Sequence, residues 1–422
     1  MADVTVYTAA SVNTNVDTYR AGPFWKSTTV GYIVFIINTG ALCYTKTTDG
    51  GASWSGPTTI IAAVVTAVDS WADWQTAGDS GTKIHIACID TAADVVRYVY
   101  LETATDTITG SDVIEACQGS GTISTTSSMA TAHISITKTR GGNIAVAARY
   151  TDSAAAVFYV FYTSPDGDTW TSKTSPWETA ADRLQLYAGN EADNQDAWAA
   201  FDDIDADAIS LKTFDNSANS WSEQAITSMT ESSNYWQFDG QIRLSDGHLI
   251  LSFWSQPDNA ASDLQVYDIN GAGSITAKTN VITNEAESVT VSVFINQVND
   301  DIYIVYCSGT AALSTVAAFY QKSTDGGATW GGETAMQADA ADDERWVSAG
   351  CLKASLGGKF QPIWYNEDLD DIFCNTDNGV SIAAVSGGWT HIAKVHGVAS
   401  AGIAKVNGVA VAAVAKFNGV SV

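Results

Sequence analysis

Short runs rich in Val, Ile, Tyr and Phe follow one another along most of the chain, and helical periodicity is hardly visible. Examples are residues 32–37 followed by 42–46, and residues 302–306 followed by 316–320. Such runs are typical of β-strands. An earlier run often ends in Gly-Gly, Asp-Gly or Asn-Asp, pairs that favour the positive backbone angles of tight hairpins. The pattern predicts a repeating unit of strand A, tight turn, strand B, loop and strand C.

A polar box follows strand C and precedes a fourth strand, D. Thr47-Thr-Asp-Gly-Gly-Ala-Ser-Trp54 returns almost letter for letter as Ser323-Thr-Asp-Gly-Gly-Ala-Thr-Trp330, and Ser164-Pro-Asp-Gly-Asp-Thr-Trp170 is a shorter copy. Worn copies lie around Asp106, Asp215, Asp268 and Asp377. The seven aspartates are 49 to 60 residues apart, a period in the range of a four-stranded propeller blade.

The box has a mechanical explanation. Its Asp and Ser or Thr side chains can bond neighbouring backbone amides, its glycines allow left-handed geometry, and its Trp can fill the gap beneath the C–D hairpin. The residues expected to act in this way are Thr47, Asp49, Gly51 and Trp54, then Ser164, Asp166 and Trp170, then Ser323, Asp325, Gly327 and Trp330. The box is therefore a staple of the fold and does not indicate a chemical activity.

These boxes resemble those of the Asp-box, or sialidase-type repeat, family of β-propellers. The resemblance covers residues 20–385 and implies one all-β propeller over residues 1–387, with seven blades favoured and six as the alternative. Residues 3–7 are expected to add a closing strand to the last blade. Asp boxes occur in sialidases, other glycan-active enzymes, assembly factors and binding proteins, so the family does not fix the function.

The net charge of −27 argues against nucleic acid as a main partner, because phosphate contacts need Lys and Arg. The six cysteines have no metal-ligand spacing, and five lie in apolar strand runs. We expect reduced core thiols, with an occasional disulfide as the alternative. The start of the chain shows no signal segment and no run long enough to span a membrane. A protein made in a host cytoplasm and exposed on a virus particle fits these features.

The last residues, 388–422, repeat at an interval of 11. Each unit places Asn-Gly or His-Gly between short apolar arms, which predicts small hairpins. Asp377 is the last acidic residue, so this tail carries +3 from three lysines, while 17 basic and 47 acidic residues give the rest of the chain −30. A segment this apolar is expected to pack against the body, against sister chains or against another protein. The repeat positions expected to drive assembly are Ile392, Lys394, Ile403, Lys405, Asn407, Val414, Lys416 and Asn418.

The tail resembles the Lys-Val-Asn-Gly-Val repeats that close some tailed-phage structural proteins. This resemblance implies attachment to other virion proteins and a homo-oligomer. The alternative is an extension that packs along the bottom of the ring.

The sialidase resemblance implies an active site with three arginines, a Tyr–Glu pair and an Asp. The chain has seven arginines and lacks the family's Arg-Ile-Pro signature, Tyr19-Arg-Ala-Gly-Pro23 being the nearest string. Four arginines on separate predicted blades are candidates for convergence, although an ion pair within a strand explains Arg149 and Arg243 equally well. These are Arg149, Arg183, Arg243 and Arg345. A sialidase-like glycoside hydrolase or lyase therefore stays the alternative function.

Bulky aromatic residues recur near the predicted D-to-A junctions, on the propeller face opposite the boxes. Aromatic rings beside carboxylates and amides suit the apolar faces and hydroxyls of sugars. The alternative is that they wedge neighbouring blades together. The candidates are Trp25, Trp71, Trp74, Tyr187, Tyr235, Trp236 and Trp346, with Arg345 beside them.

The predicted B-to-C loops are acidic. Asp202, Asp203, Asp205 and Asp207 could gather oxygen ligands for Ca²⁺, but the string fits no EF-hand, and a solvated charge run explains it better. Five scattered histidines indicate no transition-metal site, so no cofactor is expected. Together these features favour a non-catalytic structural or receptor- or glycan-contacting protein of a virus particle, in which the propeller is presented and the tail attaches.

Overall fold

The computed structural model describes most of the chain outside several loops and parts of the tail. The described ranges are 3–8, 20–119, 121–125, 132–178, 183–189, 195–203, 208–228, 238–255, 263–283, 287–309, 316–337, 344–375, 380–382 and the tail strand pairs given below.

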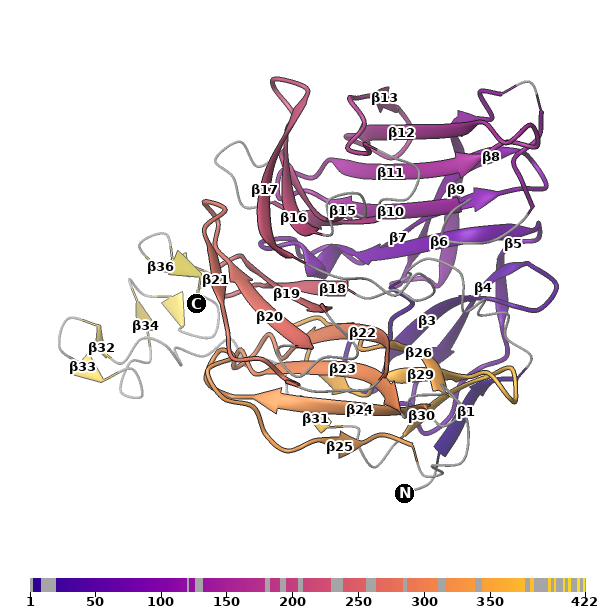
Figure 1. Ribbon diagram of the computed structural model, residues 1–422. Coiled ribbons are helices and arrows are strands. Elements are labelled where there is room, and N and C mark those ends of the chain that lie inside the picture. The colour runs from indigo at the N-terminus through magenta and orange to yellow at the C-terminus, as the bar shows by residue number, and fades with distance from the viewer. Residues whose placement is uncertain are drawn as a thin grey trace.

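Seven antiparallel sheets form the blades of a β-propeller, so the prediction of an all-β fold with seven blades is confirmed (Figure 1). Each blade runs from an inner strand A to an outer strand D. Blade 1 has β2 (Phe24–Trp25), β3 (Gly31–Ile36), β4 (Leu42–Thr47) and β5 (Thr58–Ile61). Blade 2 has β6 (Val65–Ala72), β7 (Lys83–Asp90), β8 (Val95–Glu102) and β9 (Thr107–Ala116). Blade 3 has β10 (Ala132–Lys138), β11 (Ile144–Thr151), β12 (Val157–Ser164) and β13 (Thr171–Ser172).

The remaining blades follow the same order. Blade 4 has β14 (Arg183–Ala188), β15 (Ala197–Asp203), β16 (Ala208–Asp215) and β17 (Ser220–Ser228). Blade 5 has β18 (Phe238–Arg243), β19 (His248–Trp254), β20 (Leu264–Ile269) and β21 (Ile275–Ala277). Blade 6 has β22 (Glu287–Ile295), β23 (Ile302–Gly309), β24 (Val316–Ser323) and β25 (Thr334–Ala335).

The two ends of the ring meet in blade 7. Its inner strands are β26 (Glu344–Ser348), β29 (Ile363–Asn366) and β30 (Asp371–Asn375), and β1 (Asp3–Tyr7) pairs antiparallel with β30 as its outer strand. The N-terminal strand thus closes the last blade, as the sequence predicted. The short β27 (Cys351–Leu352) also pairs in parallel with β2 of blade 1, and β28 (Gly358–Phe360) pairs with β31 (Val380–Ile382). Closure removes exposed inner edges from the sheets.

The core lies between the blades, where apolar side chains of the three inner strands face the neighbouring sheet. Trp198, Trp254 and Trp364 are fully buried there. The six cysteines are free thiols, five of them buried and Cys117 half-buried, as expected for core residues. No helix among the described residues is long and apolar enough to cross a membrane.

The three clear boxes occupy C–D turns and make the expected bonds. In blade 1, Thr47 Oγ1 accepts the Gly51 N–H at 2.9 Å and donates to Asp49 Oδ1 at 2.8 Å, and Asp49 accepts from the Ser53 N–H and hydroxyl. The boxes beginning at Ser323 and Ser164 repeat this arrangement, with small changes in the shorter copy. Gly51 has φ +83°, a conformation that glycine adopts without strain.

The worn boxes fare differently. Asp215 accepts hydrogen bonds from Ser217 and Ala218 in the turn of blade 4, and Asp106 lies in the turn of blade 2. Asp268 was wrongly placed in a turn, because it belongs to strand β20 and pairs with Arg243, while Asn270 bonds the turn amides instead. Asp377 lies outside the described residues.

Three two-residue strand pairs are described in the tail. β32 (Lys394–Val395) pairs with β33 (Val398–Ala399), β34 (Lys405–Val406) with β35 (Val409–Ala410), and β36 (Lys416–Phe417) with β37 (Val420–Ser421), each antiparallel. The side chains of the tail, and the rest of the repeat residues, lie outside the described part of the chain.

Candidate functional site

A relay of hydrogen bonds joins the inner strands of blades 2, 3 and 4. Asp69 Oδ2 on β6 accepts from the Ser135 hydroxyl at 3.0 Å and the Ile136 N–H at 2.9 Å on β10. Ser135 Oγ in turn accepts the Leu186 N–H of β14 at 2.9 Å. One buried carboxylate and one hydroxyl therefore hold three blades together.

Blades 5, 6 and 7 carry the same relay. Asp239 Oδ2 on β18 accepts from the Ser292 hydroxyl at 2.8 Å and the Val293 N–H at 2.9 Å on β22. Ser292 Oγ accepts the Ala349 N–H of blade 7 at 3.0 Å. The ring is thus tied at its centre by two equivalent arrangements.

Arg20 joins the first relay from the segment before blade 1. Its backbone N–H and Nε donate to Asp69 Oδ1 at 3.1 Å, and its Nη2 pairs with Asp69 Oδ2. Its Nη1 donates to Leu186 O at 3.0 Å, and its guanidinium lies 4.7 Å from the Trp71 ring and 5.7 Å from the Tyr187 ring. Sequence reasoning noticed Arg20 only as part of an imperfect signature. Its donors are engaged with the protein, so it is not free to hold a substrate carboxylate.

Little space is left between these residues at the centre of the ring. Arg20, Gln75, Asp239, Gln241 and Ser348 line a cavity of about 10 Å³, enough for one water molecule. Burial raises the pKa of Asp239 to about 6, and its Oδ1 has no hydrogen-bond partner among the described residues. A carboxyl with this pKa could serve as a general acid, but a sugar ring does not fit the cavity.

The candidate aromatic residues are mostly inside the protein. Trp25, Trp71, Trp74 and Tyr187 are at most 1% exposed, and Trp346 is 7% exposed. Trp71 and Tyr187 lie near the ends of their A strands, and Trp74 lies in the following turn, so they are on the box side and not at the D-to-A junctions as expected. A ring without solvent access offers no face to a sugar, and these rings pack between blades. Tyr235, Trp236 and the side chain of Arg345 lie outside the described residues.

The other candidate arginines do not converge. Arg183 begins the A strand of blade 4 and lies 3.8 Å from Asp202, whereas Arg243 ends the A strand of blade 5 and pairs with Asp246 and Asp268. These two positions are at opposite faces of the ring. Arg149 is fully buried in β11 of blade 3.

A buried His–Asp–Tyr cluster was not predicted. His85 Nε2 lies 2.9 Å from Asp73 Oδ1, and its Nδ1 lies 2.6 Å from the Tyr98 hydroxyl. Burial lowers the pKa of His85, and all three side chains are at most 2% exposed. Tyr98 packs edge-on against the box residue Trp170 at 5.2 Å. The cluster supports the box of blade 3 and is closed to a substrate.

The proposed calcium ligands are only partly described. Asp202 is buried in β15 beside Arg183, and Asp205 and Asp207 lie outside the described residues, as do the loops around them. Within the described ranges, no group of three or more His, Cys, Asp or Glu side chains could hold a metal ion.

At most blade junctions, hydrogen bonds join the outer parts of the neighbouring blades. Thr174 of blade 3 bonds Asn219 of blade 4 at 2.8 and 2.9 Å, and Thr279 of blade 5 donates to Ala328 O of blade 6 at 2.7 Å. The junctions of blades 6 and 7 and of blades 7 and 1 are closed by the bonds of Asn375 to Met336 O at 2.9 Å and of Lys359 to Gly50 O at 2.5 Å.

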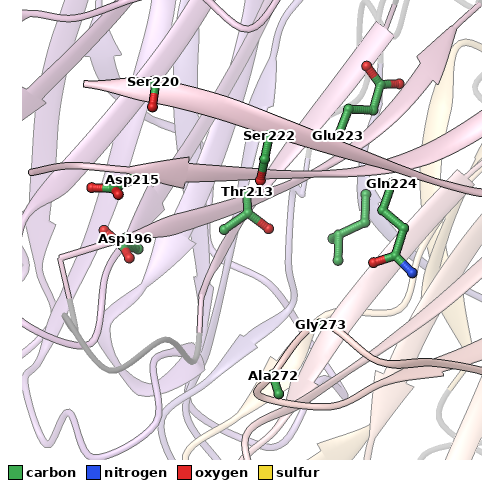
Figure 2. A pocket seen from close by; sticks show the side chains of 10 residues that line it. Asp196, Thr213, Asp215, Ser220, Ser222, Glu223, Gln224, Ala272 and Gly273 are labelled. Carbon is green, nitrogen blue, oxygen red and sulfur yellow. The ribbon is translucent and has the colours of Figure 1, made fainter. Parts of the chain in front are cut away.

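The junction of blades 4 and 5 differs. Among the described residues, no hydrogen bond joins the turn of blade 5 at residues 270–274 to strands β16 and β17 of blade 4. A groove of about 510 Å³ opens there (Figure 2). This volume is in the range of small-molecule sites.

The floor of this groove, the 4/5 groove, consists of cross-strand pairs on one face of blade 4. Strand register pairs Leu211 with Gln224, Thr213 with Ser222, and Asp215 with Ser220. Residues two apart on a strand share a face, so these six side chains, five of them polar, form one surface. Figure 2 shows Asp196 beside Asp215 at one end, and Gln224 facing the turn at Ala272 and Gly273 at the other.

The groove is a poor site for acid–base chemistry. Hydrogen bonds from the Ala218 N–H and then from the Ser217 hydroxyl lower the pKa of Asp215, so this carboxyl is a weak proton donor. Asp196 is tied to the Asn216 N–H at 2.9 Å. Hydroxyls, an amide and ionised carboxylates suit hydrogen bonding to a polyhydroxylated ligand better than proton transfer to it.

Comparison with solved structures shows what the fold is similar to. A polysaccharide lyase of the ulvan lyase type, bound to -[GlcA(1-4)Rha3S]-, has a TM-score of 0.55 and 12% identity, covering 88% of this chain and 95% of the other. A sialidase from Streptococcus pneumoniae has a TM-score of 0.43 and 9% identity over 90% and 71% of the chains, and an Aleuria aurantia lectin has 0.43 and 12% over 74% and 94%.

The first similarity shows a shared fold at low identity. No family model matches the sequence, and no curated protein is significantly similar to it. The propeller is therefore assigned by structure, and its function has to be argued from its own surface.

Proposed function

We propose that the protein is a non-catalytic, carbohydrate-binding propeller that holds a glycan in the 4/5 groove. The observation that carries this proposal is the open polar groove of about 510 Å³ at a junction where, within the described part of the chain, no hydrogen bond joins the C–D turn of blade 5 to strands β16 and β17. Its hydroxyl, amide and carboxylate groups are those that bind sugar hydroxyls in proteins, and Leu211 and Ala272 add small apolar contacts.

The charge of the site selects among glycans. Asp196 and Asp215 line the groove in a chain of net charge −27, and Glu223 beside them pairs with Lys212 Nζ at 3.4 Å. A uronate or sulfate group would meet like charge there, which costs binding energy and slows association. The similar lyase was bound to a glucuronate-containing, sulfated saccharide. For this chain we propose a neutral or amino-sugar glycan.

The alternative is a carbohydrate-active enzyme of the sialidase or lyase type. The fold shared with a polysaccharide lyase is compatible with it. Against it stand the sequestered Arg20 and the closure of the cavity that holds Asp239. Release of reducing ends or unsaturated products from bound oligosaccharides would favour the enzyme and overturn the non-catalytic proposal.

We also propose that residues 388–422 attach the propeller to other proteins of a virus particle, where it is displayed on the surface. The support is the sequence of the tail, which is apolar, without acidic residues and repeated three times beside a body of charge −30. Burial against another chain, in a homo-oligomer or in a particle, would satisfy its apolar arms.

The test of glycan binding uses the full chain on an array of neutral, amino-sugar and uronate oligosaccharides. Ser222→Arg fills the floor of the 4/5 groove with a long side chain at an exposed position, and we expect at least tenfold weaker binding of neutral sugars. Ser228→Arg, exposed at the far end of the same strand, is the matched control and should bind normally. Absence of any sugar binding, or binding unaffected by Ser222→Arg, would overturn the proposal.

A further inference from the structure

A second groove lies at the equivalent place between blades 1 and 2, which we call the 1/2 groove. Its volume is about 350 Å³. The floor again belongs to strands C and D of one blade, with Tyr44 paired to Thr58 and Lys46 two residues further along. The wall is again the C–D turn of the next blade, here at Asp106. The two grooves therefore share a construction but differ in side chains.

The 1/2 groove contains an aromatic ring that the 4/5 groove lacks. Trp54, the last residue of the first box, is partly exposed and lines the groove, and its ring centroid lies 6.2 Å from that of the buried Trp25. All three box tryptophans pack against the fold, but Trp170 and Trp330 line neither groove. Trp170 packs on Tyr98 and donates to Gly167 O at 3.1 Å, and Trp330 donates to Thr279 O at 2.7 Å.

The polar groups opposite the ring are held in place. Asp106 accepts from Lys46 Nζ at 2.6 Å and from the Tyr32 hydroxyl at 2.7 Å. Ser53 of the box and Ser55, which follows it, add hydroxyls. A charged donor and a charged acceptor side by side match two neighbouring hydroxyls of a sugar ring, and charge-assisted hydrogen bonds are the stronger kind. Because Lys46 is neutralised by Asp106, the pair does not favour an anionic sugar.

We propose that the 1/2 groove is a second carbohydrate subsite, in which a neutral pyranose stacks on Trp54 and bonds Lys46 and Asp106 through its hydroxyls. The inference rests on the proposed glycan-binding function, and it assigns the box tryptophan a binding role besides its structural one. The protein then has two subsites on its rim, on blades 1 and 4, and binds a multivalent glycan with avidity.

The test is a titration of the full chain by calorimetry with the neutral oligosaccharide that binds best on the array. We expect two sites per chain. Thr58→Arg fills the 1/2 groove at an exposed position and should remove one site, as should Ser222→Arg in the 4/5 groove, and the double variant should remove both. Unchanged melting of each variant shows that the ring is intact.

The outcomes of this titration distinguish the two proposals. One site per chain that Ser222→Arg removes and Thr58→Arg leaves intact overturns the second subsite and upholds the first. One site per chain that Thr58→Arg removes and Ser222→Arg leaves intact upholds the subsite in the 1/2 groove and overturns the proposed site in the 4/5 groove. A direct readout is the ¹⁹F resonance of Trp54 in fluorotryptophan-labelled protein, which should shift on adding the sugar to wild type and stay still in Thr58→Arg. A Trp54 resonance that is unmoved at saturation contradicts stacking.

Discussion

Asp69 and Asp239 accept the same pair of hydrogen bonds from the next blade, but their charges are treated differently. Arg20 pairs with Asp69, whereas Asp239 Oδ1 has no hydrogen-bond partner among the described residues. Both carboxyls are buried at the centre of the ring. Removing the charge should therefore change the free energy of unfolding in opposite directions at these two equivalent positions.

Asp69→Asn should destabilise the fold and Asp239→Asn should stabilise it at neutral pH. Removing one partner of a buried ion pair costs about 3 to 5 kcal/mol, because the Arg20 guanidinium stays buried without its counter-charge. Asn at position 239 keeps an acceptor for Ser292 and Val293 and removes the buried charge. With a pKa of about 6 in place of about 3.9, the gain is up to about 3 kcal/mol. Urea unfolding at pH 8 measures both.

The pH dependence of the Asp239 effect has a definite sign. The pKa of Asp239 is higher in the folded than in the unfolded chain, so its contribution is favourable below the unfolded value of about 4 and is lost as the pH rises through about 6. The advantage of Asp239→Asn over wild type should vanish near pH 4 and be complete by pH 7. An advantage that is equal at both pH values would show that ionisation of Asp239 is not its cause.

The repeating unit, the tight turns and the closing strand could be predicted because each depends on residues close in sequence. The central relays could not, since Asp69, Ser135 and Leu186 meet only after the ring has closed. Trp71 was misplaced because strand A of blade 2 extends to Ala72 and carries the ring to the far face. The 4/5 groove forms where strands β16 and β17 meet the turn at residues 270–274 of the next blade, and no local pattern encodes such a meeting. Asp268 was predicted to bond the turn of blade 5, but the Asn270 side chain accepts the hydrogen bonds from the turn amides.

Asp325→Ala should lower the melting temperature by a few degrees and leave glycan binding unchanged. The Asp325 carboxylate accepts from the Thr329 N–H at 2.9 Å and from its hydroxyl at 2.6 Å, bonds that an alanine cannot make. This box borders neither groove, so the substitution tests the structural role of the box without touching the proposed binding surface. Scanning calorimetry gives the melting temperature and the array gives binding. Lost binding with unchanged melting would show that the box acts on function directly.

Truncation after Gly387 should leave a folded, monomeric propeller, while the full chain is a trimer or larger. The reason is that the inner relays and the β1–β30 closure lie wholly within residues 1–387, whereas the apolar repeats of the tail need a partner surface. Light scattering gives the mass, and circular dichroism checks the fold. A truncated chain that fails to fold would place the tail in the core, and two monomers would exclude self-assembly through it.

Selection against acidic sugars by the 4/5 groove should weaken with salt. At low ionic strength Asp196 and Asp215 repel a uronate, and the Debye length falls to about 3 Å at 1 M salt, which screens charges at the exposed rim. Binding of a uronate oligosaccharide should therefore rise with salt, while binding of its neutral counterpart stays nearly constant. Asp215→Asn, which keeps an oxygen acceptor for the Ala218 N–H, should reproduce part of the gain at low salt, with the exposed Glu367→Gln on blade 7 as the control. Calorimetry at 20 mM and 1 M salt makes the comparison. Discrimination against the uronate that is independent of both salt and Asp215 would mean that shape, and not charge, selects the sugar.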